Sequence, residues 1–289
     1  MTISVPIDTR IMFGGAKYCY AKFLDHTVTE RIQNPDELCG NRDTLINRKS
    51  PGRRRVSFTT WFDPTLPLWN FLLPHLGMTQ SPTGTFTASQ AIPTTEIIID
   101  KVGAVHKYTL CRLSRCIIRC QTGTLPVSAE CLWLAVDEVE ASGTTWVDGT
   151  VDNTFGFPGT TYTIDGDAYN LDRFAFAVNS NLIPSWNAST TVTDIGPGPR
   201  QVMLASTVPY IPGNKDLYWD HKDTIDPDNP IAHALAITNG DETITINFPA
   251  ADLNPESPSI EGAREEIRLP MTWNANRQAA VAAFNVVIS

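Results

Sequence analysis

Polar and apolar positions alternate most regularly between residues 127 and 136 of the chain. The pattern divides these side chains between two faces of a strand: Ser128, Glu130, Leu132, Leu134 and Val136 on one face, and Val127, Ala129, Cys131, Trp133 and Ala135 on the other. Both sets become apolar towards residue 136, which indicates a strand covered on both sides at that end. Residues 105–120 form a similar run, and a Gly-containing loop separates the two. The pattern predicts a long antiparallel hairpin with strands over residues 105–120 and 125–138.

The first strand of this hairpin also carries three arginines among apolar neighbours, at Arg112, Arg115 and Arg119. A guanidinium stays charged in proteins and needs water or a hydrogen-bonding partner. We therefore expect one side of this strand to face solvent or a neighbouring subunit.

Two shorter hairpins follow, each centred on an Asp-Gly or Asn-Gly turn. The first has strands over residues 160–164 and 168–178 around Asp165-Gly166-Asp167, and the second has strands over residues 231–238 and 242–248 around Asn239-Gly240-Asp241. These turn residues tolerate the positive φ that tight hairpins require. Further strands are predicted over residues 56–60, 96–102 and 264–273. Short strands separated by turns are typical of an antiparallel β-sandwich or barrel.

One segment, residues 66–76, is predicted to be helical. Asp63 is the expected N-cap, Pro64 suits the first helical position, and Gly77 suits the end. Two internal prolines limit the helix to two or three turns. Its Leu, Trp and Phe side chains are expected to pack across an open face of a sheet.

Three long segments lack a regular pattern of this kind: residues 1–55, 142–159 and 208–230. Loops of this length are uncommon in a compact domain and usually serve binding. We therefore expect an N-terminal arm over residues 1–55, a β domain over residues 56–275, and a C-terminal strand or arm over residues 276–289.

The length and composition are those of a folded protein made in the cytosol. A chain of 289 residues, 42% of them hydrophobic, can bury a large core, and no apolar run is long enough to cross a bilayer. The first residues show neither the basic nor the apolar region of a secretory signal. The six cysteines are expected to be buried thiols, because such a protein needs no disulfides and their spacing does not match a zinc site.

Charge is divided unevenly along the chain. Residues 1–135 carry 15 Lys and Arg against 10 Asp and Glu, and residues 136–289 carry 7 against 21, which gives net charges of +5 and −14. An acidic C-terminal half argues against that half binding nucleic acid, although many of its carboxylates also suit a solvated surface. A basic run over residues 48–55 fits a solvated loop or a contact with an acidic patch of another subunit, and it is the one feature that suggests nucleic acid.

No known catalytic or cofactor motif occurs in the sequence. The nucleophile elbow, the phosphate loop, the dinucleotide-binding glycines and the His-Glu-x-x-His zinc motif are absent, and the five histidines are scattered. Asp165, Asp167 and Asp172 lack the spacing of a calcium loop, so a hairpin turn is the better interpretation. Residues 220–228 hold four aspartates that suit a solvated loop as well as a cation site. We expect no catalytic residue, no metal and no cofactor.

Three features, in this order along the chain, resemble the tail tube proteins of long-tailed bacteriophages (siphophages). The Leu-rich helical segment ends in Leu72-Leu73-Pro74-His75-Leu76-Gly77 ahead of the central strands. Residues 162–182 are similar to a hairpin with an Asp-Gly turn that leads into a strand, an Asn-containing segment and an apolar residue. The late strands flank Asn239-Gly240 and are followed by an acidic loop and residues 264–273. The resemblance covers the layout of residues 56–275.

The resemblance implies a fold and a role. The fold is an antiparallel β-sandwich or barrel of tail tube type with one short flanking helix and long extensions, and the role is that of the major tail tube subunit. Subunits would form hexameric rings, and the rings would stack into a hollow tube through which DNA is ejected. Ring closure would remove the open edges of the sheet. The implied partners are further copies of the chain and other tail proteins, namely the tape measure, tail terminator and distal tail proteins.

The resemblance also implies a use for the charge split. DNA would be transient cargo in the lumen without specific binding, because a lumen rich in carboxylates repels phosphate. The candidate lumen residues are carboxylates on the hairpins: Glu130, Asp165, Asp167 and Asp172. The candidates for contacts between subunits are basic: Arg48, Lys49, Arg53, Arg54 and Arg55. The protein would assemble in the host cytoplasm and reside in the virion tail, with no membrane partner.

Two other functions are alternatives. Another β-rich virion protein, such as a capsid decoration or baseplate component, would form a closed ring or cap instead of an open-ended tube. A carbohydrate-binding β-sandwich would use exposed tryptophans such as Trp146, Trp186 and Trp219, although tryptophan more often packs in a core or interface. A monomeric globular domain is the simplest case, and the three long segments argue against it.

Overall fold

The computed structural model describes residues 10–18, 22–26, 56–101, 104–121, 126–146, 153–187, 192–219, 231–258, 267–275 and 283–289. These residues form twenty strands and two helices. Every pairing between the strands is antiparallel, so the predicted class is confirmed. The sheets are open, and no closed barrel is found among the described strands.

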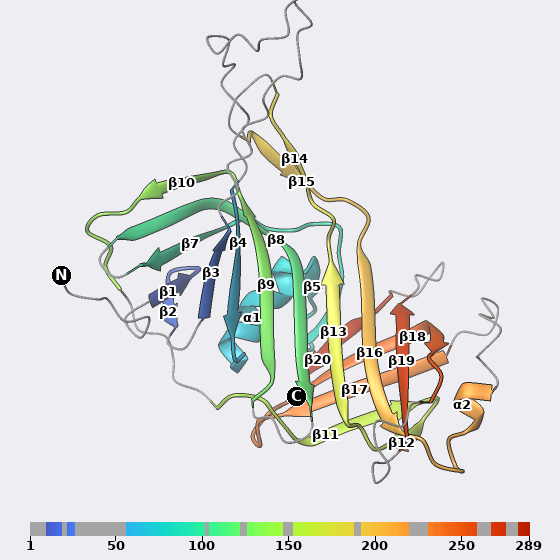
Figure 1. Ribbon diagram of the computed structural model, residues 1–289. Coiled ribbons are helices and arrows are strands. Elements are labelled where there is room, and N and C mark those ends of the chain that lie inside the picture. Colours follow the sequence, from blue (N-terminus) through green and yellow to red (C-terminus); the bar gives the residue numbers. More distant parts are fainter. Residues whose placement is uncertain are drawn as a thin grey trace, which may run out of the picture.

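The front layer in Figure 1 is a sheet with the strand order β3–β4–β9–β8–β13–β16–β19. Its strands are β3 (Lys22–His26), β4 (Val56–Phe62), β9 (Ser128–Ala135), β8 (Val105–Gln121), β13 (Arg173–Asn179), β16 (Gln201–Pro209) and β19 (Arg268–Ala275). The long hairpin predicted from the alternating pattern is confirmed as β8 and β9, with Cys116 directly opposite Cys131.

A second layer has the strand order β12–β11–β17–β18–β20–β6–β5 and crosses the front layer in Figure 1. Its strands are β12 (Asp167–Tyr169), β11 (Gly156–Ile164), β17 (Ile231–Thr238), β18 (Thr243–Pro255), β20 (Asn285–Ile288), β6 (Thr85–Ala88) and β5 (Met78–Gln80). The first half of β18 pairs with β17 and β20, and its second half pairs with β19. One strand therefore belongs to both layers.

A smaller sheet, in the order β2–β1–β7–β8–β10, continues from the upper part of β8. Its other strands are β1 (Arg10–Phe13), β2 (Ala16–Tyr18), β7 (Thr95–Asp100) and β10 (Asp137–Glu140). β8 changes partners near Leu110, an exposed residue with φ of +50°. A separate ribbon of β14 (Ile183–Ser185) and β15 (Asp194–Gly196) lies above the front layer in Figure 1.

Part of the predicted N-terminal extension belongs to these sheets. β1, β2 and β3 lie within residues 10–26, and Ile11 and Phe13 are buried in the main core. In β1, the three residues Ile11, Met12 and Phe13 are all buried. The basic residues expected to contact other subunits lie outside the described residues: Arg48, Lys49, Arg53, Arg54 and Arg55.

α1 (Leu66–His75) confirms the predicted helix, but the expected N-cap is wrong by two residues. Thr65, not Asp63, is the N-cap, and a proline lies in the first turn at Pro67. An isolated bridge between Thr65 and Thr154 holds Thr65 extended, and proline fits the first turn because its missing N–H has no partner there. Gly77 ends the helix as expected, with φ of +72°.

α1 packs behind β8 and β9 (Figure 1). Its buried side chains are Leu68, Trp69, Leu72, Leu73 and His75. The Phe71 ring lies 6.2 Å from the Trp133 ring of β9, so the helix covers the sheet face that the sequence predicted. Burial of each large apolar side chain contributes about 1.5–3 kcal/mol.

The hairpin predicted over residues 160–178 is only partly correct. Asp165 and Gly166 form the expected turn, with φ of +49° and +87°, and join β11 to β12. The predicted second strand is interrupted at residues 170–172, and β13 pairs with β8 and β16 instead of β11. The interruption lets the chain leave the second layer and enter the front layer. The hairpin around Asn239-Gly240 is confirmed as β17 and β18.

Aromatic side chains join the two layers. The Phe176 ring of β13 lies 5.9 Å from the Phe248 ring of β18 and 5.8 Å from Phe284. The second helix, α2 (Asp216–Trp219), has no buried residue and lies at the side of the molecule. Within the described ranges, no helix is both long and apolar enough to cross a membrane.

Candidate functional site

The front layer has an inner face that packs on the second layer and an outer face. On β13, Phe174, Phe176 and Val178 are buried, while the residues between them point outward because side chains alternate along a strand. On β9, Ala129, Cys131 and Trp133 are buried in the same way. This confirms the predicted division of residues 127–136 between two faces.

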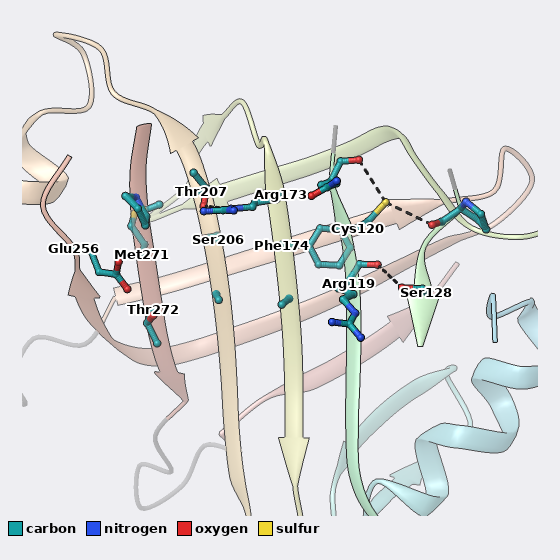
Figure 2. A pocket seen from close by; sticks show the side chains of 15 residues that line it. Arg119, Cys120, Ser128, Arg173, Phe174, Ser206, Thr207, Glu256, Met271 and Thr272 are labelled. Carbon is teal, nitrogen blue, oxygen red and sulfur yellow. Dashed lines mark hydrogen bonds between the residues drawn. The ribbon is translucent and has the colours of Figure 1, made fainter. Parts of the chain in front are cut away.

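A groove of about 580 Å³ crosses the outer face near the start of β13 (Figure 2). Its floor contains Ala175 and Ala205, which are direct neighbours on β13 and β16. Arg119 of β8 lies beside Ala175, and Thr272 of β19 lies beside Ala205. Directly opposite residues share one face of a sheet, so the short alanines form a depression between longer side chains. Three strand spacings place its two rims about 14 Å apart.

Two arginines, Arg119 and Arg173, give the groove a positive charge. Arg173 lies along the groove in Figure 2, and its Nε–H donates a hydrogen bond to Thr207 Oγ1 at 3.0 Å. None of the ion pairs among the described residues includes Arg173. Glu256, which is exposed, lies at the opposite rim beyond Met271. Arg119 thus lies at the β8 rim, the Arg173 guanidinium lies over β16, and Glu256 lies beyond them at the β19 side.

Arg119 belongs to a charged cluster on the same face. Its Nη2 lies 2.5 Å from Glu130 Oε2, and Arg115 Nη2 lies 3.2 Å from Glu130 Oε1. One carboxylate thus serves two guanidinium groups, and the cluster keeps a net positive charge. Arg115 and Arg119 are two of the three arginines that the sequence predicted to face solvent or a subunit, and their side chains are 45% and 51% exposed. The third, Arg112, is only 21% exposed and lies 3.7 Å from Asp194 Oδ1. Exposed pairs of this kind contribute only about 0–1 kcal/mol to stability.

The four candidate lumen carboxylates lie in three separate places. Glu130 is the centre of the arginine cluster. Asp172 Oδ2 is 3.2 Å from Arg268 Nε, and its side chain is 24% exposed. Asp165 and Asp167 are exposed at the turn between β11 and β12, in the second layer. The structure therefore does not bring the four together into one acidic surface.

A buried polar cluster lies between the layers. The Tyr162 hydroxyl is 3.2 Å from Ser206 Oγ and 3.5 Å from His233 Nδ1, and Trp273 Nε1–H donates to Ser206 Oγ at 3.2 Å. His233 stacks between the Phe248 and Trp273 rings. Burial lowers the pKa of His233 to about 3 and raises the pKa of Tyr162. His233 was expected to be one of five scattered histidines; its place in the alternation of β17 is the signal for burial.

This cluster lacks the geometry of a nucleophilic site. Ser206 is 3% exposed and bonds with Tyr162 and Trp273, while His233 bonds with Tyr162 instead of the serine. A catalytic serine needs a base within hydrogen-bond reach and access to substrate. The hydrogen bonds of this cluster give partners to polar side chains that are buried between the two layers.

The four cysteines of the described residues are free and buried. Cys116 and Cys131 face each other across β8 and β9 with 3.5 Å between their Sγ atoms. Burial raises the pKa of Cys111 and of Cys131. The prediction of buried thiols is confirmed for these four, while Cys19 and Cys39 lie outside the described residues.

The remaining candidates are dispersed. No group of three or more His, Cys, Asp or Glu side chains suited to a metal ion occurs in the part of the chain that the structure describes. Of the tryptophans proposed as sugar platforms, Trp186 packs on a small cluster with Leu182 and Ile195, and Trp219 is 58% exposed near α2. The aspartates of residues 220–228 lie outside the described residues.

Comparison with known proteins adds no further assignment. Neither a model of a known protein family nor a curated protein matches the sequence. The groove with its two arginines is therefore the candidate functional site on structural grounds alone.

Proposed function

We propose that the chain is a structural virion protein, the major tail tube subunit of a long-tailed bacteriophage. Copies would join into rings, which we propose to be hexameric, and the rings would stack into a hollow tube for DNA ejection. The fold is then an elaborated β-sandwich of tail tube type. The support comes from the resemblance in residues 56–275, the layered antiparallel sheets and the helix α1 on one of them.

The observation that carries this proposal is the open front layer. Among the described strands, β3 pairs only with β4 at one edge, and the second half of β18 pairs only with β19 at the other. Open edges favour pairing with further copies, and closure around an axis removes them. Pro255 lacks an N–H and Ala251 also pairs with Ile231 of β17, so the contact along β18 would depend mainly on residues 252–254.

Charge supports DNA as cargo in place of a bound ligand. The C-terminal half carries a net charge of −14 and would repel the phosphate backbone. Glu130 and Asp172 are paired with arginines, so neither supplies free negative charge. Of the four candidates, Asp165 and Asp167 keep exposed carboxylates.

Electron microscopy of the purified, concentrated protein tests this proposal. Tubes or stacked rings with a central channel are the expected result, and sedimentation velocity should show large species that increase with concentration. Compact monomers alone, across conditions that favour assembly, would contradict it. Closed single rings or caps would favour a decoration or baseplate protein. A glycan array should show no binding, because the exposed tryptophan Trp219 and the packed Trp186 lie on different elements.

A further inference from the structure

We propose that the groove on the outer face receives the acidic turn between β11 and β12 of a second copy. The groove is defined by Arg119, Ala175, Arg173, Ala205 and Thr272, and the acidic turn by Asp165, Gly166 and Asp167. This inference rests on the proposed self-assembly and names the surfaces of one of its contacts. It gives Asp165 and Asp167 a role between subunits in place of one in the lumen.

Charge complementarity is the first argument. Asp165 and Asp167 are exposed, and neither forms an ion pair with any described cation. Arg173 likewise has no carboxylate partner in the described part of its own chain, and its guanidinium is held over the groove by Thr207. Opposite charges that lie on different layers of one copy can pair between two copies.

Shape is the second argument. A two-stranded hairpin is about 5 Å between strand axes and about 10 Å across with its side chains, which is less than the spacing of about 14 Å between the groove rims. Gly166 at the tip has no side chain, and a Cβ added there would meet no atom within 4 Å. The side chains on the floor of the groove, Ala175 and Ala205, are short, so the groove can admit such a tip.

The charges along the groove define the orientation of the contact. The carboxylates of the turn would lie between Arg119 at the β8 rim and the Arg173 guanidinium beside Thr207, and Glu256 would lie outside this interval, beyond Met271. The two surfaces belong to different parts of the chain, so the contact is head-to-tail. A head-to-tail contact repeats from copy to copy, and it either closes a ring or extends a stack.

Charge reversal tests the contact in the full chain. We expect Arg173→Glu and Asp167→Arg each to raise the concentration needed for assembly by about tenfold or more, because like charges then meet. Combining both substitutions in one chain should restore most of the assembly. Sedimentation velocity and electron microscopy measure assembly, and circular dichroism checks that each variant is folded.

Matched controls use exposed charges away from both surfaces. Asp241→Arg reverses an aspartate at the β17–β18 turn, and Lys215→Glu reverses a lysine before α2. Both should assemble like the unmodified chain.

Four outcomes would overturn the inference, and the first three separate it from the proposed function. If the unmodified chain and both single charge-reversal variants form tubes, the proposed contact is wrong and the proposed tail tube function stands. If the two reversals fail to rescue each other, the pairing is wrong. If Arg173→Glu leaves assembly intact but abolishes binding of a duplex DNA probe, the groove binds nucleic acid. A chain that never assembles overturns both proposals.

Discussion

His233 lies between the Phe248 and Trp273 rings, with centroid distances of 4.4 and 4.3 Å, and is 4% exposed. A charged imidazole in this place would lose its hydration, so the folded protein holds the neutral form and the pKa falls to about 3. Burial acts in the same direction on the pKa of His75, whose Nδ1 lies 3.1 Å from the Pro93 carbonyl oxygen. At the scale of residues, burial in the core thus favours the neutral form of both histidines.

The position of His233 predicts acid sensitivity. The unfolded chain binds a proton at His233 below about pH 6.5, whereas the folded chain resists it until about pH 3. Stability is therefore complete above pH 6.5 and is lost as the pH falls between these values. The free energy of unfolding should drop by about 2 kcal/mol from pH 7 to pH 5 on account of this group. Urea denaturation at several pH values measures it.

His233→Phe keeps an aromatic ring in the stack and removes the titration. This variant should lose less stability between pH 7 and pH 5 than the unmodified chain, even if its stability at pH 7 is lower because the contact with Tyr162 is gone. Phe284→Leu is the control, because it changes a ring packed on Phe248 without changing a titratable group, and its free energy of unfolding should depend on pH as in the unmodified chain. If the free energy of unfolding depends on pH equally in all three proteins, His233 does not titrate on unfolding.

At the scale of elements, the end of α1 depends on a residue distant in the sequence. Arg200 Nη1 donates hydrogen bonds to the carbonyl oxygens of Leu76, Gly77 and Ser89, at 3.3, 2.7 and 3.2 Å. The last carbonyls of a helix have no partner within it, and a cation there also complements the helix dipole. Gly77 was predicted to end the helix from its residue type, whereas no local pattern indicates the contact of Arg200 with this end.

Replacing this cation should loosen the helix end. Arg200→Met keeps most of the apolar stem and removes the donors, and we expect it to lower the free energy of unfolding by about 1–3 kcal/mol. Lys107→Met is the matched control: its ammonium pairs with the exposed Glu96, and the loss should be at most about 1 kcal/mol. Chemical denaturation measures both, and similar losses would argue against a special role for Arg200.

At the scale of the whole molecule, the two layers are joined covalently and by packing. β18 pairs with strands of both layers, and Phe248 on this strand contacts Phe176, His233 and Phe284. Because the layers share one strand and one core, we expect them to unfold together.

Phe248→Ala tests this cooperativity. Truncation of a buried phenylalanine should lower the free energy of unfolding by about 3–5 kcal/mol. Tryptophan fluorescence and far-ultraviolet circular dichroism should still report one shared transition. Two separate transitions, or hydrogen exchange that becomes fast in only one layer, would show that the layers are independent units.

Local order was predictable where neighbouring residues are sufficient to specify it. Asp165-Gly166 and Asn239-Gly240 specify turns because few residues tolerate positive φ, and residues 127–136 identify their buried face because side chains alternate on a strand. The break before β13 was missed because residues 168–178 keep a strand pattern throughout. Only the partners β8 and β16 show that the chain changes layers there.

The candidate site could also be predicted only in part. Arg115 and Arg119 were predicted to be exposed, because a charged side chain within an apolar strand must find water or a partner. Ala175 and Ala205 gave no signal at all, because a groove arises only when short side chains on adjacent strands become neighbours. The grouping of Glu130 with two arginines, and the separation of the four candidate carboxylates, also follow from strand pairing.

The sequence by itself determined that this is a mainly β, antiparallel protein with one substantial helix and an acidic C-terminal half. These properties depend on the period of the pattern, on turn chemistry and on composition, which are all local. Tertiary structure alone decided the two crossing layers, the shared strands β8 and β18, the buried His233 and the groove with its arginines. Each of these requires residues far apart in the sequence to meet, and no local pattern encodes which strands will pair.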